Sequence, residues 1–475
     1  MKDGNGFNDN DNNEEFEDLS PQIRRFEDMI RGNANYFFDV DVFEAIIDHY
    51  LDTNNIKSAL KGISIAISQH PNAVPILLRK AEIHASAGKL NKSLEILARA
   101  ESLEPFNADV YILRGSIFSQ LRDHEEAVRN LKLAIKHSDD QPDDLYVDLA
   151  FEYESLKKWD KAIGSLMKAL ELNKENEAAL FELSYCYEMC GMPEKSIDFF
   201  NKFIDDNPYS FTAWYNLGNS YIRRGLFEKA IEAFDFCITI NESFSSAYFN
   251  KANAYVQMER YHEAIDCYAE TFLYEEPQAV TYCYIGECFE KLEMAEQAYE
   301  NFLKASEIDP ELADSWLGMG IALSMMGAHT EAVNFIEKAI HIDEKNPDFW
   351  FIFGEVLEKA DMIEDALRAY LKAIELDPHN IDLLLDYTNF LYEHFSAETA
   401  IETMQQIILK IGKVPDLMYR MVAYLIFGGR KAEAITQMEE ALQVNYDAHK
   451  KLFTYFPEIQ NLSAITELTE LYRKK

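Results

Sequence analysis

Apolar residues recur along most of the chain at spacings of three and four, and short polar stretches such as RRGLFEK at 223–229 interrupt them. This spacing puts the apolar residues on one side of an α-helix, and the polar stretches suit turns between helices. Compared with itself at a period of 34, the chain repeats twelve times, with one extra residue between His137 and Asp144. The units begin near residues 40, 74, 108, 143, 177, 211, 245, 279, 313, 347, 381 and 415. The pattern therefore predicts tandem helical hairpins over residues 40–448.

Each unit carries small residues at two places, numbered here from the start of the unit. The twentieth place is alanine or serine in every unit, as in Ala230 and Ala298. The eighth place is glycine, alanine or serine in nine units, as in Gly218 and Gly286. Because two helices approach closely only where both surfaces lack bulk, these places predict a tight antiparallel crossing within each hairpin.

One unit shows most clearly what the other units share. Residues 211–242 carry W-x2-L-G-x2-Y, then alanine, then phenylalanine, at Trp214, Leu217, Gly218, Tyr221, Ala230 and Phe234. On these residues the chain resembles the tetratricopeptide repeat family, over residues 40–448. The resemblance implies an all-α, right-handed superhelical solenoid of about twelve helix-turn-helix units, whose first helices line the concave side. Trp316 and Trp350 hold the place of Trp214, so we interpret these aromatics as packing residues and not as a cofactor site.

The two ends of the chain lie outside the repeats. Residues 1–19 are acidic and rich in asparagine, and this composition predicts a disordered tail. Residues 20–39, with Phe26, and residues 449–475, with Leu468, each place apolar residues on one helical face. Since the flank of a terminal repeat needs a cover with a polar outer side, both segments are expected to form capping helices.

The charge of the chain restricts its partners. The chain carries 83 Asp and Glu against 45 Lys and Arg, a net charge of −38. That charge repels a phosphate backbone and an anionic membrane surface, so we expect no nucleic-acid partner. No stretch is apolar over a transmembrane length, and the first residues lack the apolar core of a signal peptide. We therefore expect no membrane insertion and a cytoplasmic location.

No motif indicates catalytic or cofactor chemistry. Residues 318–320 read GMG but lack the third glycine and the βαβ setting of a dinucleotide site, and neither GxxxxGK[ST] nor GxSxG occurs. Cys186 and Cys190 are four residues apart, and a metal site would need two further ligands that the sequence does not supply. We expect structural thiols here, and no catalytic residues, metal or cofactor in the chain.

Places 5, 6, 9, 12 and 13 of each first helix are the ones that the resemblance assigns to the groove, together with place 2. Place 2 is often aspartate, which suits a helix start, and we set it aside. The remaining places hold fourteen acids and five bases. The acids include Glu82, Asp148, Glu154, Glu182, Glu188, Glu287, Glu290, Glu355, Glu358 and Asp386, and the bases are Arg79, Arg223, Lys291, Lys359 and Arg420. The groove is expected to be acidic, either for binding or as a share of the overall acidity.

Asparagine holds groove places 6 and 9 in two successive units, beside an aromatic residue at place 5. A carboxamide both donates and accepts, so four of them predict a ladder for the backbone of an extended peptide. Neighbouring glutamates favour a peptide rich in Lys or Arg. The alternative is that asparagine is simply the commonest family residue at these places. The predicted peptide-binding residues are Tyr215, Asn216, Asn219, Phe249, Asn250, Asn253, Glu188, Glu287 and Glu290.

These observations predict a protein-binding scaffold or adaptor that is not an enzyme. Its concave groove is expected to hold an extended peptide or a partner protein. Two alternatives stay open: an architectural solenoid that associates with itself, and a non-catalytic regulatory subunit of an enzyme complex. The fold alone does not decide among them.

Overall fold

The computed structural model of the chain describes residues 19–138 and 143–473, and every regular element within them is a helix. The predicted all-α fold of tandem hairpins is therefore confirmed for these residues. The acidic segment 1–19 lies outside the described residues except for Leu19. By its internal contacts the chain divides into two compact parts, Met1–Asn241 and Glu242–Lys475. We call these the first unit and the second unit, describe each separately, and call each 34-residue repeat a hairpin.

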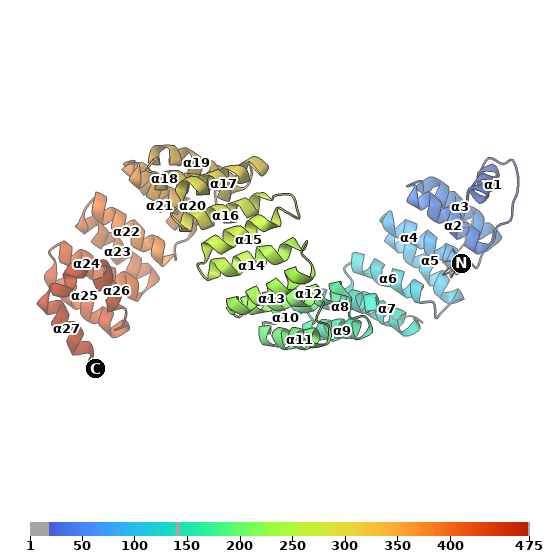
Figure 1. Cartoon of the computed structure of the whole chain (residues 1–475), viewed down its shortest axis with the longest axis horizontal. Helices are drawn as coiled ribbons and strands as arrows, with labels where there is room; N and C mark the ends of the chain where they lie inside the picture. Colours follow the sequence, from blue (N-terminus) through green and yellow to red (C-terminus); the bar gives the residue numbers. More distant parts are fainter. Residues whose placement is uncertain (1–18, 139–142, 474–475) are drawn as a thin grey trace, which may run out of the picture. The chain divides into compact units, whose positions relative to one another are not determined.

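The first unit holds a leading helix and six hairpins (Figure 1). Each first helix packs against its own second helix, and successive first helices such as α2, α4 and α6 also touch one another. The helices are α1 (Ser20–Ile30), α2 (Val40–Asp52), α3 (Ile56–Gln69), α4 (Val74–Ser86), α5 (Leu90–Leu103), α6 (Ala108–Gln120), α7 (His124–His137), α8 (Asp143–Ser155), α9 (Trp159–Leu172), α10 (Glu177–Met189), α11 (Pro193–Asp206), α12 (Phe211–Arg223) and α13 (Phe227–Ile240).

The second unit holds six further hairpins and a closing segment. The twelve first helices of the chain, from α2 to α24, begin at the residues where the sequence units begin. The helices are α14 (Ser245–Gln257), α15 (Tyr261–Thr271), α16 (Ala279–Lys291), α17 (Ala295–Ile308), α18 (Ala313–Met325), α19 (His329–Ile342), α20 (Pro347–Lys359), α21 (Ile363–Leu376), α22 (Ile381–His394), α23 (Ala397–Ile411), α24 (Pro415–Phe427), α25 (Lys431–Val444), α26 (His449–Tyr455), η1 (Pro457–Asn461) and α27 (Ser463–Arg473).

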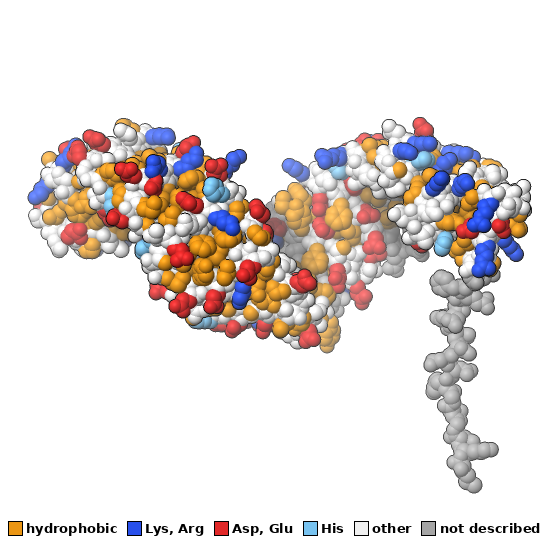
Figure 2. Space-filling view, turned by 90° about the horizontal axis from the view of Figure 1, so that it is seen from above, with side chains coloured by type: hydrophobic (Ala, Val, Ile, Leu, Met, Phe, Trp, Pro, Cys, Tyr) orange, Lys and Arg blue, Asp and Glu red, His pale blue; other side chains and the backbone are white. Residues whose placement is uncertain are grey.

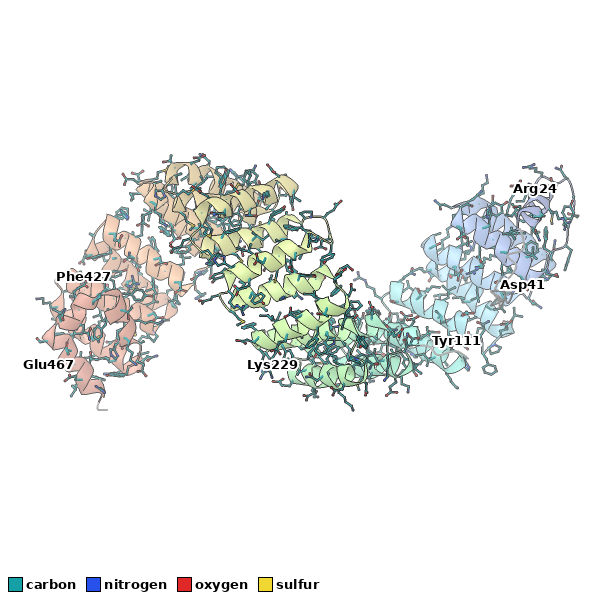
Figure 3. All side chains as sticks on the ribbon, in the orientation of Figure 1. Arg24, Asp41, Tyr111, Lys229, Phe427 and Glu467 are labelled. Atoms are coloured by element: carbon teal, nitrogen blue, oxygen red, sulfur yellow. The ribbon has the colours of Figure 1, made fainter. Side chains whose placement is uncertain are left out.

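Side chains fill the space between paired helices (Figure 3), and the small places allow the close approach. The residue at place 20 is at most 2% exposed in every hairpin. A methyl group added to Gly218 would lie 2.6 Å from the ring of Phe234, and one added to Gly286 would lie 2.9 Å from the ring of Phe302. The predicted tight crossing is confirmed, and the glycine makes room for the large side chain at place 24.

The turn inside each hairpin has a feature that the sequence pattern did not indicate. The residue at place 15 has a positive φ in eleven of the twelve hairpins. Five of these residues are glycines, and the other six have φ between 54° and 61°. The non-glycine residues are Asn54, Arg122, Lys157, Glu259, Glu293 and Asp361. A left-handed residue therefore reverses the chain between the helices, whatever side chain it carries.

Both ends of the array are covered by apolar side chains. On α1, Phe26 is fully buried, and its ring centroid lies 5.8 Å from that of Tyr50 on α2. In the closing segment, Leu452, Ile459 and Ile465 are buried in one cluster with residues of α24 and α25. These contacts fit the capping roles expected for residues 20–39 and 449–475, which stay predictions.

Candidate functional site

In the first unit, the groove places of three first helices share one hollow surface. A cavity of about 540 Å³ lies between α2, α4 and α6. All but one of its lining residues stand at places 2, 5, 6 and 9 of their repeats. They are Glu44, Pro75, Leu78, Arg79, Glu82, Asn107, Asp109, Ile112, Leu113 and Ser116. We call the surface formed by places 2, 5, 6, 9, 12 and 13 within a unit its first-helix face.

Ion pairs neutralise part of the first-helix face in the first unit. The Nη2 atom of Arg79 donates to Asp48 at 3.0 Å, and its Nη1 atom donates to Glu82 at 3.1 Å. Arg223 on α12 forms an ion pair with Glu188 on α10. Glu188, predicted to attract a basic peptide, is therefore already paired within the protein.

Other acids on the first-helix face of this unit have raised pKa values. Burial raises the pKa values of Asp148, Glu154 and Glu182, and the Sγ atom of Cys186 donates to Glu154 at 3.3 Å. Burial and Glu154 also raise the pKa of Cys186, and burial raises that of Cys190. Both thiols therefore stay protonated, as expected of structural cysteines.

The residues of the predicted asparagine ladder differ in how far they are buried. Asn216 is only 3% exposed, and its Nδ2 atom donates to the carbonyl oxygen of Thr212 at 3.0 Å. This places Asn216 in the packing beneath the face and corrects the expectation that its carboxamide is presented to a ligand. Asn219 is half-buried, and Tyr215 packs against Phe181 and Phe234 with ring centroids 5.9 Å apart in each case.

The other half of the ladder belongs to the second unit. Asn250 and Asn253 on α14 are half-buried, and Oδ1 of Asn253 accepts a hydrogen bond from the hydroxyl of Tyr268 at 2.5 Å. Phe249 lies beside them, 5.3 Å from Tyr268 and 5.5 Å from Tyr284 between ring centroids. Since the four asparagines are divided between the two units, a continuous ladder stays a prediction.

The acids of the second unit are the most strongly perturbed part of the predicted site. Glu287 is exposed to solvent, yet desolvation by the surrounding protein, Glu290 and Asp314 together raise its pKa to about 7, against the opposing charge of Lys291. Burial also raises the pKa values of Glu290, Glu355 and Asp386. Within the described residues, none of these four acids has an ion-pair partner within 4 Å. Lys291, Lys359 and Arg420 lower these pKa values from a distance without forming an ion pair, so none of the four carboxylates is held by a cation of the described residues.

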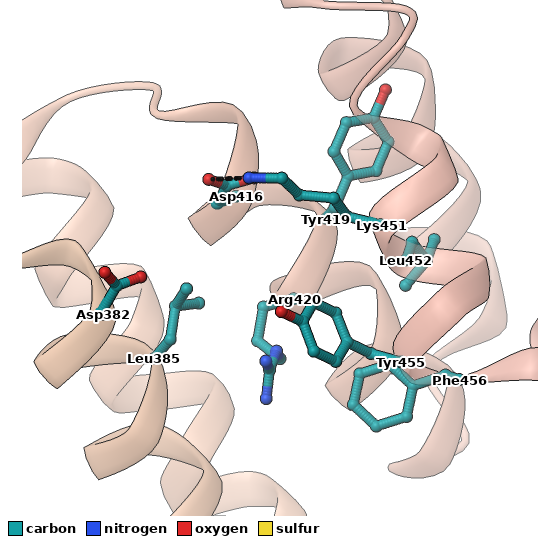
Figure 4. A pocket seen from close by; sticks show the side chains of 9 residues that line it. All are labelled: Asp382, Leu385, Asp416, Tyr419, Arg420, Lys451, Leu452, Tyr455 and Phe456. Carbon is teal, nitrogen blue, oxygen red and sulfur yellow. Dashed lines mark hydrogen bonds and ion pairs between the residues drawn. The ribbon is translucent and has the colours of Figure 1, made fainter. Parts of the chain in front are cut away.

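One basic residue of the first-helix face is held by the protein itself (Figure 4). The guanidinium of Arg420 lies 5.2 Å from the ring centroid of Tyr455 and 5.3 Å from that of Phe456. Beside it, Lys451 donates to Asp416 at 2.9 Å. These residues line a cavity of only about 50 Å³, so internal contacts occupy most of the space there.

One group of possible metal ligands comes together among residues 19–138 and 143–473. Ligand atoms of Glu358, Glu393 and His394 all lie within 4.8 Å of one another. Nε2 of His394 already lies 2.7 Å from Oε1 of Glu358, whose other oxygen accepts from the hydroxyl of Tyr370 at 3.0 Å. The contact with His394 and the hydrogen bond from Tyr370 account for the position of Glu358, and neither Cys186 nor Cys190 belongs to this group.

The sequence reasoning missed Tyr284 as a site residue. It stands at place 6 of its repeat, between Phe249 on α14 and Glu287 one turn later on α16, and it is 36% exposed. An aromatic residue at a groove place next to an acid was the signal that could have found it. Figure 2 shows that acidic and hydrophobic side chains are interspersed on the visible face of each unit.

Comparison with known families identifies the repeats. Three models of the tetratricopeptide repeat match the chain: one over residues 211–244, one over 108–138, 143–176, 245–270 and 347–380, and one over 178–210. The chain therefore contains tetratricopeptide repeats, as its resemblance to that family predicted. Such repeats form protein-interaction scaffolds that offer extended surfaces to their partners, and the family is typically non-catalytic.

Solved structures resemble the chain only distantly. The TPR protein YrrB, described as having an unusual peptide-binding site, is 23% identical, with a TM-score of 0.33, over 39% of this chain and 95% of its own. The Cut9–Hcn1 hetero-tetramer of the APC/C is 14% identical, with a TM-score of 0.39, over 96% and 93%. The Naa15/Naa10 complex bound to HypK-THB is 13% identical, with a TM-score of 0.32, over 91% and 80%. No curated protein matches the chain. Among the described helices, none combines the length and apolar character needed to cross a membrane.

Proposed function

We propose that the chain is a non-catalytic scaffold whose first-helix face in the second unit binds an extended, basic segment of a partner protein. One observation carries the proposal: Glu287, Glu290, Glu355 and Asp386 line this face with raised pKa values and without an ion-pair partner among the described residues. Partly desolvated carboxylates without an ion-pair partner attract Lys and Arg side chains more strongly than fully solvated ones do.

The carboxamides beside these acids suit the backbone of the same segment. Asn250 and Asn253 stand one helical turn apart on α14, and Asn253 accepts a hydrogen bond from Tyr268, whose ring stacks on that of Tyr284. Carboxamides pair with peptide N–H and C=O groups regardless of the side chains that the peptide carries. In this proposal the acids select charge, and the asparagines hold the peptide in an extended form.

Fluorescence anisotropy with labelled twelve-residue peptides tests the proposal. A peptide of alternating glycine and lysine is expected to bind, whereas one of alternating glycine and serine is not. Binding of the basic peptide should weaken as salt is raised, because exposed charges are screened. Equal binding of both peptides would contradict an electrostatic site.

A matched pair of double variants locates the binding. Glu290→Gln with Glu355→Gln removes two charges from the first-helix face and should weaken binding of the basic peptide about tenfold. Glu300→Gln with Glu337→Gln removes the same charge from exposed positions on the second helices α17 and α19 and should change binding little. An equal effect of both pairs would show that the overall acidity of the protein, and not this face, binds the peptide.

Sedimentation at several concentrations separates this function from an architectural one, because a self-associating solenoid would form concentration-dependent oligomers.

A further inference from the structure

Three aromatic rings pack together on the proposed binding face of the second unit. The rings of Tyr268 and Tyr284 are stacked, with centroids 5.7 Å apart and planes inclined by 12°, and Phe249 lies against both. Tyr268 is 1% exposed, whereas Tyr284 is 36% exposed. Tyr268 therefore covers one side of the Tyr284 ring, and part of that ring remains open to solvent.

An acid without an ion-pair partner stands beside this open ring. Glu287 follows Tyr284 by three residues on α16, so the two side chains lie on the same side of the helix. Lys291, one turn further, influences the titration of Glu287 but forms no ion pair with it. The electron-rich ring and the carboxylate thus face the same space.

Elsewhere in this unit the protein supplies a cation for some of its aromatic rings. Arg260 lies 4.6 Å from the ring centroid of Tyr255, Lys304 lies 5.5 Å from Tyr282, and Lys338 lies 3.2 Å from Trp316. Arg420 does the same for Tyr455 (Figure 4). Among the described residues, no Lys or Arg takes this position over Tyr284. Tyr284, the groove tyrosine next to Glu287, therefore has no cation from the described part of the chain on its open side.

We propose that Tyr284 and Glu287 form a subsite for one arginine side chain of the bound segment. The guanidinium stacks on the open part of the Tyr284 ring, and two of its N–H groups donate to the carboxylate of Glu287. Arginine fits better than lysine, because its planar group both stacks on a ring and pairs with a carboxylate through two hydrogen bonds. This inference rests on the proposed function and adds the residue type that the site selects.

Three labelled peptides of equal length test the preference: glycine alternating with arginine, with lysine, or with citrulline, the neutral isostere of arginine. At pH 8 the arginine peptide should bind about threefold to fivefold more tightly than the lysine peptide, the scale of one cation–π contact. The citrulline peptide should bind most weakly. Equal affinity of the arginine and lysine peptides would overturn the subsite while leaving the proposed function intact.

Variants assign the preference to the two residues. Tyr284→Leu should reduce the arginine-to-lysine affinity ratio to about one, whereas Tyr284→Phe, which keeps the ring, should preserve it. Glu287→Gln should weaken both basic peptides. Tyr185→Leu is the matched control: Tyr185 is also an exposed tyrosine at a groove place, but its neighbour Glu188 is already paired with Arg223. A fall in the ratio with Tyr185→Leu equal to that with Tyr284→Leu would contradict the assignment.

A second measurement does not depend on peptide binding. In protein labelled with 3-fluorotyrosine, the ¹⁹F resonance of Tyr284 is the one that disappears in Tyr284→Phe. Titration with argininamide should shift this resonance further than titration with lysinamide at the same concentration. If no basic peptide binds, the proposed function fails. If argininamide and lysinamide shift the Tyr284 resonance equally, the arginine subsite is contradicted whatever the peptide measurements show.

Discussion

The raised pKa of Glu287 makes the free energy of unfolding depend on pH through this one carboxyl group. Its pKa of about 7 in the folded chain lies above the ordinary value of 4.5. The folded state therefore holds this proton more tightly than the unfolded state does. The resulting stabilisation is complete below the unfolded pKa and is lost as the pH rises through about 7.

Replacing this acid by its neutral analogue should show that dependence. Glu287→Gln is expected to raise the free energy of unfolding at pH 8 by less than about 1 kcal/mol, since the group is exposed and screened, and to change it little at pH 4. The charged groups that act on Glu287 are Glu290 and Lys291 on its own helix and Asp314 on α18. Urea denaturation at both pH values measures the effect, and Glu300→Gln on α17 is the control. A gain that is the same at pH 4 and pH 8 would show that the charge of Glu287 is not the cause.

Two residues at the same repeat place show what the sequence could predict of the site. Place 6 holds Asn216, which is 3% exposed, and Tyr284, which is 36% exposed. The resemblance to the repeat family assigns both to the groove, because a place in the repeat records only the direction of a side chain around the helix. How deeply a side chain lies depends on the neighbouring helices, as when Asn216 turns back to the carbonyl of Thr212. Residue types indicated which groove places carry acids, whereas they did not indicate the buried carboxamide or the open tyrosine ring.

At the scale of the helix and its turn, the repeat was far more predictable. Small residues must recur wherever two helices cross, as Gly218 and Gly286 do. This recurrence made the 34-residue period visible in the sequence, and the helix starts follow the same period. The left-handed residue at place 15 escaped prediction, since residues as different as Arg122, Gly225 and Glu293 hold that place. Hairpin geometry overrides the local preference of the side chain there.

The turn residue allows a paired test of backbone strain. Gly225 has φ of 68°, and a methyl group added to it would meet no atom within 4 Å. Gly225→Ala should therefore cost about 1–2 kcal/mol through the backbone alone. Replacing Arg122, which has φ of 60°, by glycine should change the stability in the opposite direction. Arg122→Gly relieves a similar strain but adds about 0.5–1 kcal/mol of flexibility cost, so its net gain should stay below about 1 kcal/mol.

Hydrogen exchange of the hairpins α12–α13 and α6–α7 measures the two changes. Faster exchange in the first hairpin with Gly225→Ala, and equal or slower exchange in the second with Arg122→Gly, is the expected pair of results. Loss of protection with Arg122→Gly would show that its side chain stabilises the turn by more than the strain it introduces.

At the scale of the whole molecule, the array needs a cover at its end. The closing segment buries Leu452, Ile459 and Ile465 against apolar side chains such as Met438 and Leu442. Deletion of residues 449–475 should therefore expose a contiguous apolar surface and promote aggregation. Deletion of residues 1–19, a strongly polar stretch, should leave thermal unfolding almost unchanged. Light scattering and circular dichroism compare the two truncations, and similar behaviour of both would remove the basis for a C-terminal cap.

The division into two compact units is a property that the period could not reveal. The 34-residue spacing continues through Asn241 and Glu242 without a break. A repeat pattern records how each hairpin resembles the next, and it says nothing of how strongly neighbouring hairpins hold together.

Within each unit, helices pack against helices of their own hairpin and of the adjacent hairpins. In a chain built in this way the hairpins stand in series, so every interface carries the same tension and the weakest one gives way first. Each hairpin that gives way would release roughly 110 Å of slack at about 3.3 Å per residue, and the remaining stack would still be folded. The protein would then yield in steps under tension and recover hairpin by hairpin when released, as an extensible tether does.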